Sequence, residues 1–317
     1  MFIEKYFVTH YLVKYLNQNQ EKCEILVPNL HGRVLYRHAI KELAIKYIKK
    51  NTNINNPVFL SSEHYGNCAF CTEFRKLEKS HAIANTIFRT LLKKVEGRQP
   101  IVINTSAKHL KFDSDTWAVH QLCKVCESYF NNNFEEYSIN ALRGKNPNVK
   151  IVKTLNGVSF KGLDQEVIAK YCLSVYWRAA LSVHPSYSSV HIFPEFNEYL
   201  KLYFKNDIKL NKSAISLRMF NLVDKDKILN DEAISSFIVC PFTRFEDKRL
   251  VFFLKLESFF IEIKIEKLGF KEKNKRGYLG KNKNILFLDN KDIFSIQEIL
   301  NNFAYGKYLH ENTPSKA

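Results

Sequence analysis

Two Cys-x-x-Cys pairs constrain the fold of this 317-residue chain more than any other feature. Cys68 and Cys71 form the first pair, and Cys123 and Cys126 form the second. Two thiolates separated by two residues bind a metal as a tight knuckle, and two knuckles complete a tetrahedral shell of four sulfurs. We therefore expect one structural zinc ion on these cysteines. Ordinary reduced cysteines without metal are the alternative.

The other three cysteines, Cys23, Cys172 and Cys240, stand alone. An odd cysteine count without a secretory signal argues against a disulfide framework. Cys172 lies in an apolar pattern of helical spacing, which is typical of a small core residue. The seven cysteines therefore divide into four metal ligands and three isolated thiols.

The apolar segments are too short or too interrupted for export or membrane insertion. Lys5 and Lys14 break up the N-terminal apolar residues, so no signal peptide is expected. The most apolar stretch, residues 250–254, ends at Lys255, far short of the roughly 20 residues that span a bilayer. These patterns predict a cytoplasmic protein without a membrane partner.

The chain carries a net charge of +16, from 48 basic and 32 acidic residues. A field of this sign attracts phosphate backbones and holds them through the release of counterions. The charge therefore favours a nucleic-acid partner. A generally lysine-rich composition is the alternative explanation.

Three regions of different character predict an α+β protein. Apolar residues at helical spacing within residues 2–16 and 34–49 predict an N-terminal helical segment over 1–60. The cysteine-rich domain is expected over 61–145, and a companion domain of helices and an antiparallel sheet over 146–317.

Within the companion domain, Asp164 is expected to cap a long helix, and a shorter helix is expected near 195–204. β-branched and aromatic runs predict strands that are followed by a final helix at 295–303. The expected strands are 215–220, 236–240, 250–256, 259–265 and 285–288.

A short motif lies between the two cysteine pairs. Residues 79–85 read Lys-Ser-His-Ala-Ile-Ala-Asn, and Glu127 directly follows Cys126 at the start of an expected helix. A first cysteine pair, a histidine motif, and a second pair leading into a helix together resemble the HNH, or ββα-metal, endonuclease family. The resemblance covers about residues 63–140, and uncharacterised bacterial HNH-like proteins look similar.

The resemblance implies a metal-dependent hydrolase that cleaves phosphodiester bonds of nucleic acid. DNA is the expected substrate, and RNA is the alternative. His81 matches the general base, and Glu127 matches the position that holds a catalytic Mg²⁺ or Mn²⁺ ion. Asn104 is the candidate for the residue that orients the histidine. In bacteria, nucleases of this type with a large companion domain often belong to defence systems, including antiviral defence, or to mobile elements.

Two positions depart from the family pattern and leave alternatives open. Ser80 stands where the family usually has aspartate, and Ala84 stands where it usually has proline. His81 is alternatively a neighbour or ligand of the zinc site, and Glu127 alternatively an acid favoured by the helix dipole. A second hypothesis is therefore a catalytically inactive, zinc-stapled protein that binds nucleic acid or forms a complex with a protein partner.

Two basic clusters are candidates for contacting phosphates. One follows the histidine motif, and the other lies in a glycine-containing segment, 264–283, expected to be a loop or hairpin. Basic side chains interleaved with an aromatic ring can hold phosphates and stack a base, whereas a solvated lysine-rich loop is the alternative. The candidate residues are Arg89, Lys93, Lys94, Lys271, Lys273, Lys275, Arg276 and Tyr278.

Overall fold

A computed structural model describes residues 10–16, 22–28, 45–52, 58–95, 99–104, 109–212, 214–265, 275–280 and 284–312. The chain divides into two compact units. The first unit consists of residues 1–81, 118–129 and 181–183, and the second of residues 82–117, 130–180 and 184–317. This division differs from the three consecutive domains expected from the sequence, because residues 82–117 belong with the second unit.

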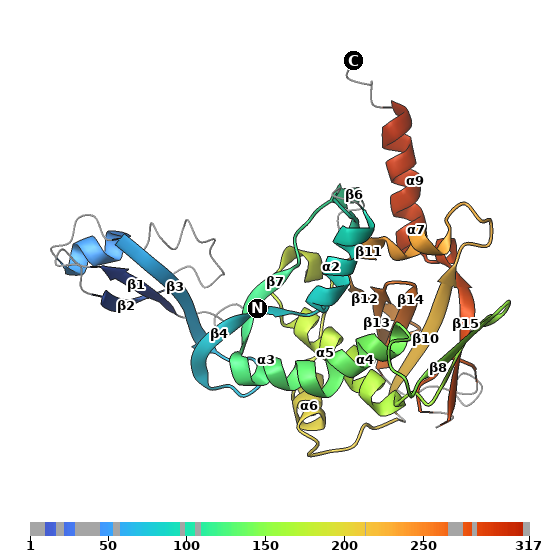
Figure 1. Cartoon of the computed structure of the whole chain (residues 1–317), viewed down its shortest axis with the longest axis horizontal. Coiled ribbons are helices and arrows are strands. Elements are labelled where there is room, and N and C mark those ends of the chain that lie inside the picture. The colour runs from blue at the N-terminus through green and yellow to red at the C-terminus, as the bar shows by residue number, and fades with distance from the viewer. Residues whose placement is uncertain are drawn as a thin grey trace. The chain divides into compact units, whose positions relative to one another are not determined.

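The first unit contains a five-stranded antiparallel sheet in the order β2-β1-β3-β4-β7 (Figure 1). Helix α3, Lys124–Phe130, begins directly after the edge strand β7. The strands are β1 His10–Leu16, β2 Lys22–Pro28, β3 Val58–Asn67, β4 Phe74–His81 and β7 Ala118–Cys123.

The prediction of helices at the N-terminus is wrong for β1 and β2. Tyr11, Val13 and Tyr15 alternate along β1, and aromatic and β-branched residues favour extended backbone. β1 pairs with β2 on one side and β3 on the other, so pairing between strands overrides the helical spacing. Residues 45–51 are helical, in agreement with the end of the expected helix, whereas 34–44 lie outside the described residues.

The second unit contains a seven-stranded sheet in the order β12-β13-β14-β10-β15-β9-β8, and a three-stranded sheet in the order β11-β5-β6. The pairs β10–β15 and β11–β5 are parallel, so the expected antiparallel sheet is in fact mixed. The strands are β5 Ile101–Asn104, β6 His109–Phe112, β8 Lys150–Thr154, β9 Gly157–Lys161, β10 Ile215–Val223, β11 Phe237–Val239, β12 Phe242–Glu246, β13 Arg249–Leu256, β14 Phe259–Ile265 and β15 Ile285–Asp292.

The expected helices of the companion domain are confirmed. Asp164 caps α5, because its Oδ1 accepts hydrogen bonds from the backbone N–H groups of Glu166 and Val167 at 3.0 and 3.1 Å. None of the described helices has the length and apolar character needed to cross a membrane. The helices are α2 Asn85–Lys94, α4 Glu136–Leu142, α5 Gln165–Ala180, α6 Pro194–Phe204, α7 Asp231–Ser235 and α9 Gln297–Asn312, with a π-helical turn, Asn131–Glu135, before α4.

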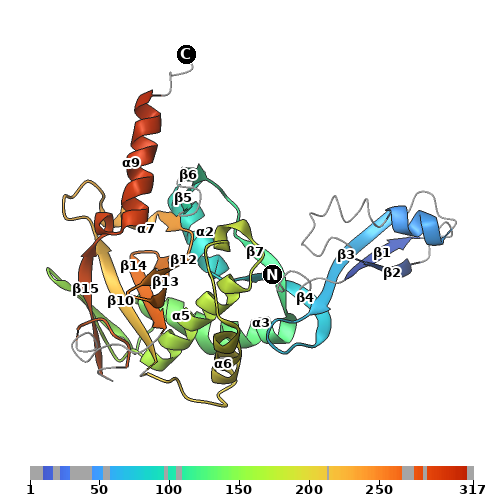
Figure 2. The same ribbon diagram turned by 180° about the vertical axis from the view of Figure 1, so that it is seen from behind.

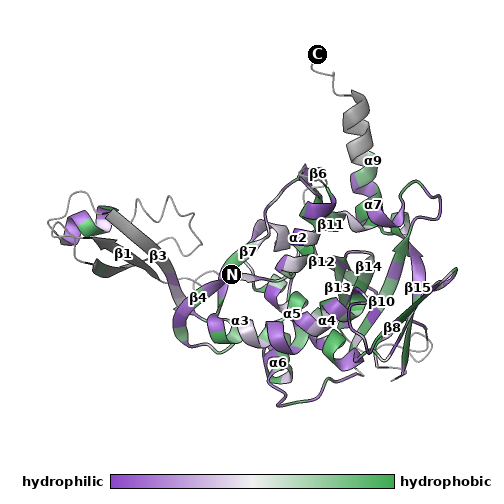
Figure 3. Cartoon of the chain, viewed as in Figure 1, coloured by the Kyte–Doolittle hydropathy of each residue, from purple (hydrophilic) through white to green (hydrophobic). Residues whose placement is uncertain are grey.

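Alternate residues of β13 face two different layers of the second unit, as the pleat of a strand requires. Phe252 contacts Tyr176 of α5, with ring centroids 4.6 Å apart, whereas Phe253 joins an apolar cluster that includes residues of α7 and α9. Helix α5 lies between this sheet and α6 (Figures 1 and 2), where its Trp177 packs against Phe204. The strands β13 and β14 are accordingly rich in apolar residues (Figure 3).

Candidate metal centre

The first cysteine pair lies in the tight loop between β3 and β4. The backbone N–H of Cys68 donates to the carbonyl of Glu73 at 2.9 Å, and the N–H of Thr72 donates to the carbonyl of Cys68 at 2.9 Å. Thr72 has a φ of 66°, a left-handed conformation that turns the chain sharply. The turn brings Cys71 back beside Cys68, as a metal-binding knuckle requires.

The second cysteine pair lies where β7 passes into α3. Cys123 ends β7, and Cys126 lies in the first turn of the helix. The backbone N–H of Cys123 donates to the Sγ of Cys68 at 3.3 Å, and the N–H of Ala69 donates to the carbonyl of Gln121 at 3.1 Å. These bonds hold the first knuckle against the second.

The four sulfurs form one compact group. All four Sγ atoms lie within 4.8 Å of one another, and those of Cys71 and Cys123 are 3.9 Å apart. Metal–sulfur bonds of about 2.3 Å in a tetrahedron place neighbouring sulfurs about 3.8 Å apart. Cys71 is half-buried and the other three cysteines are buried. The group can therefore hold a metal ion such as zinc, and its donors and spacing fit that ion.

The pKa values of the cluster cysteines give an electrostatic reason for a cation to bind among them. A hydrogen bond from the Cys126 thiol lowers the pKa of Cys68 to about 4, although burial opposes this shift. The same bond, followed by burial and the charge on Cys68, raises the pKa of Cys126. A thiolate therefore keeps its neighbour protonated. Four thiolates in this small volume require a positive ion among them.

A β-bulge distorts the strand pair that carries the second knuckle. Glu78 pairs with Leu122 but Lys79 pairs with His120, so Gln121 is an extra residue in β7. The buried Ser80 has its hydroxyl at the bulge, where Oγ accepts a hydrogen bond from the N–H of Leu122 at 3.2 Å. The hydroxyl thus supplies an acceptor to the backbone of β7 where the bulge makes the ladder irregular.

Two histidines stack face to face across β4. His64 on β3 and His120 on β7 have ring centroids 3.6 Å apart and planes inclined by 8°. The His120 Nδ1 donates to the carbonyl of Leu77 on β4 at 3.0 Å. Burial, and next the proximity of His120, lower the pKa of His64 to about 3, and burial lowers the pKa of His120. Both rings are therefore neutral at physiological pH.

Sequence analysis did not identify this histidine pair. Each histidine precedes a cysteine knuckle by a few residues, His64 before Cys68 and His120 before Cys123, and this repeated spacing was the signal available. The stacking depends on β3, β4 and β7 being neighbours in one sheet, which the sequence does not specify locally.

The three predicted catalytic residues lie on different elements. His81 ends β4 opposite Ala118, Glu127 lies in the first turn of α3, and Asn104 ends β5 in the second unit. Among the residues that the structure describes, only the four cysteines form a group of three or more potential ligands close enough to share a metal. The catalytic roles of His81, Glu127 and Asn104 stay predictions.

The predicted basic residues near the histidine motif lie on α2, in the second unit. Arg89 and Lys93 are exposed. The Lys94 Nζ donates to the Ser235 Oγ at 2.6 Å, so this lysine has a contact within the protein. Whether these residues contact phosphates stays a prediction.

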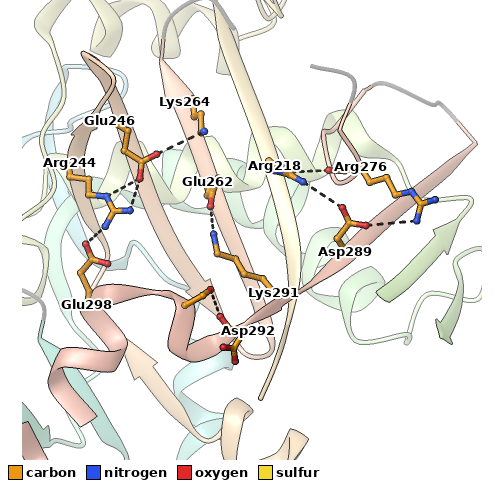
Figure 4. A network of polar contacts seen from close by, with 11 residues as sticks. Arg218, Arg244, Glu246, Glu262, Lys264, Arg276, Asp289, Lys291, Asp292 and Glu298 are labelled. Carbon is orange, nitrogen blue, oxygen red and sulfur yellow. Dashed lines mark hydrogen bonds and ion pairs between the residues drawn. The ribbon is translucent and has the colours of Figure 1, made fainter. Parts of the chain in front are cut away.

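The second predicted cluster is partly described. Lys271 and Lys273 lie outside the described residues, and Lys275 is exposed. Figure 4 shows Arg276 and Arg218 on either side of Asp289, at 4.0 and 3.5 Å from its carboxylate oxygens.

Paired charges extend across this face of the seven-stranded sheet. Lys291 pairs with Glu262 at 2.7 Å, and Arg244 pairs with both Glu246 and Glu298 (Figure 4). Acidic partners offset much of the positive charge. The face is therefore less attractive to phosphates than its arginines and lysines alone suggest.

Comparisons of the chain with protein-family models, with curated proteins and with solved structures give no match.

Replacing one ligand tests the metal centre directly. We expect purified wild-type protein to contain one zinc ion per chain and Cys71→Ser to lose most of it, as measured by elemental analysis. Because structural zinc contributes an apparent ~10–16 kcal/mol, the variant should also unfold at a lower temperature. Cys23→Ser changes a cysteine outside the cluster and should keep its metal. Wild-type protein without a transition metal would contradict the assignment.

Replacing Ser80 tests the bulge. Ser80→Ala leaves the buried N–H of Leu122 without its acceptor, which should lower the free energy of unfolding by about 1–3 kcal/mol. Chemical denaturation measures the change. The exposed Ser188 provides the control, since Ser188→Ala should change stability by less than about 0.5 kcal/mol. Equal stability of Ser80→Ala and wild type would show that the bond is unimportant.

The stacked histidines predict a pH dependence of stability. The unfolded chain protonates His64 near pH 6.5, whereas the folded chain does so only near pH 3. The free energy of unfolding is therefore not reduced by His64 above pH 6.5. Between pH 6.5 and 3 it decreases as the pH falls, by at most about 1.4 kcal/mol per pH unit, because only the unfolded chain is protonated at His64 in this range.

Denaturation midpoints between pH 7.5 and 5.5, with metal content measured in each sample, provide the test. His64→Gln should flatten the dependence, and replacement of the exposed His191 by glutamine should not. Identical slopes for wild type and His64→Gln would refute the prediction.

Proposed function

We propose that this protein is a metal-dependent endonuclease of the HNH-like type that cleaves phosphodiester bonds in nucleic acid, with DNA as the expected substrate. The observation that carries the proposal is the four-sulfur cluster that connects the loop between β3 and β4 with β7 and α3. Strands β4 and β7 are antiparallel neighbours, and α3 follows β7. This succession of strand, strand and helix supports a ββα-metal arrangement, with residues 82–117 inserted between the strands.

The proposed roles follow from the places of His81 and Glu127 in this succession. His81 ends the first strand, and histidine can accept a proton from water at neutral pH. Glu127 follows the last cysteine ligand in the first turn of the helix and offers a carboxylate to Mg²⁺ or Mn²⁺. Such ions are commonly held by one or two carboxylates together with water and substrate phosphates. When bound, the ion stabilises charge on the phosphate and the leaving oxygen.

One observation favours a second candidate function, a zinc-stapled protein that binds nucleic acid or a protein partner without hydrolysis. The family's aspartate position is occupied by Ser80, whose buried hydroxyl already bonds to the backbone of Leu122. A hydroxyl engaged in this way is a poor substitute for a carboxylate ligand. In the nuclease proposal, Glu127 therefore supplies the acidic ligand of the motif.

A cleavage assay distinguishes the two functions. Full-length protein incubated with DNA or RNA and Mg²⁺ or Mn²⁺ should nick the DNA. His81→Ala should reduce the rate by about 10²–10⁴-fold, the usual contribution of a general base. His191→Ala removes an exposed histidine of the second unit and should leave the rate unchanged. Both variants should retain zinc, which excludes loss of the fold as the cause.

Intact nucleic acid after incubation with zinc-loaded protein and either ion would overturn the nuclease proposal. Binding of the same nucleic acids, measured over a range of salt concentrations, would then test the second candidate. Electrostatic binding should weaken steeply as salt increases, because phosphate contacts release counterions. Binding that is absent or independent of salt would leave complex formation with a protein as the remaining function.

A further inference from the structure

A cavity of about 840 Å³ lies within the second unit, beside the N-terminal end of α5, strand β10 and the segment Tyr278–Gly280. From its walls and charges, we propose that this cavity binds a nucleotide. The volume lies within the range of about 300–1,000 Å³ found for ligand pockets. The inference stands on the second unit alone and does not depend on the proposed nuclease activity.

Backbone hydrogen bonds fix one wall of the cavity in place. The segment around Tyr278 is held along β10, because the Met219 N–H donates to the carbonyl of Gly277 at 2.9 Å and the Leu279 N–H donates to that of Leu217 at 3.0 Å. Gly277 has a φ of 86°, and a Cβ there would lie 2.4 Å from the Met219 carbonyl oxygen. Glycine thus permits this close approach, and the wall exists before any ligand binds.

A second contact fixes the segment to helix α5. The Gly280 N–H donates to the Oε1 of the buried Gln165 at 2.7 Å. Gly280 also lies close to Lys212, since a Cβ on this glycine would lie 2.8 Å from the lysine Nζ. The cavity is therefore bounded by an ordered helix end, a strand and a clamped loop.

The surfaces of the cavity suit a flat, partly apolar group. Leucine side chains supply apolar walls, among them Leu163 and Leu217, and Tyr278 supplies an aromatic ring. Tyr278 is only 7% exposed, and the Arg218 guanidinium lies 5.4 Å from its ring centroid. Aromatic and apolar side chains are the usual neighbours of a bound base.

The charged groups of the cavity suit the rest of a nucleotide. Lys161 and Lys212 are exposed and make no ion pair with any residue that the structure describes, so both amines are available to phosphate oxygens. Two carboxylates, Asp164 and Glu166, also line the cavity. Carboxylates accept hydrogen bonds from ribose hydroxyls in many nucleotide sites.

This combination distinguishes a nucleotide from simpler ligands. A purely apolar molecule would leave the two lysines without a partner. An inorganic polyanion would leave the apolar walls unused and would meet the like charges of Asp164 and Glu166. A nucleotide has a base, hydroxyl groups and phosphates, which match all three kinds of surface. The same chemistry occurs in a free mononucleotide and in the terminal nucleotide of a strand.

Calorimetric titration of the full-length protein provides the test. The probes are the ribonucleoside 5′-mono- and triphosphates and short single-stranded DNA and RNA oligonucleotides. At least one probe should bind saturably, and Lys161→Glu/Lys212→Glu should weaken its binding by about tenfold or more, since both phosphate contacts are lost. The control Lys145→Glu/Lys225→Glu changes the net charge equally at exposed lysines outside the cavity and should bind as wild type does.

The two sources give different outcomes. Binding of mononucleotides that depends on Lys161 and Lys212 identifies a free nucleotide, whereas binding of oligonucleotides alone, with the same dependence, identifies a strand terminus. The proposal is overturned if no probe binds, or if the control pair weakens binding as much as the cavity pair does.

Discussion

The mutual repulsion of closely placed thiolates is the constraint on which the first unit depends. Four cysteine sulfurs within 4.8 Å can all be charged only when a cation lies among them. The ligands come from the loop between β3 and β4 and from the junction of β7 with α3, so one ion would connect three strands and a helix. Such a connection stabilises the folded unit, because the free energy of binding a structural metal adds directly to that of folding.

The second unit depends on apolar packing instead. Helix α5 is buried on nearly all sides, and its Tyr176 and Trp177 contact the seven-stranded sheet on one side and α6 on the other. The opposite face of the sheet divides into an apolar cluster and a field of paired charges (Figure 4). The charged groups that this unit buries have partners within the protein, as Arg178 has in Glu135 and Lys255 in the carbonyl of Phe237.

Local signals in the sequence predicted the parts of the structure that depend on local chemistry. The spacing of the cysteines indicated one four-sulfur group, and Asp164 marked the start of α5, because each signal acts within a few residues. Pairings between distant segments were not predictable in this way. The strands at the N-terminus, the stack of His64 on His120 and the bond from Leu122 to Ser80 all require knowledge of which strands are neighbours.

The path of the chain between the two units has a consequence for dissecting the protein. The chain passes from one unit to the other at 81/82, 117/118, 129/130, 180/181 and 183/184. Neither unit is a continuous stretch of sequence. Cutting the chain at one point therefore cannot separate the two units with both intact. A fragment that isolates the cysteine cluster from the second unit therefore needs β4 and β7 rejoined by an engineered linker in place of residues 82–117.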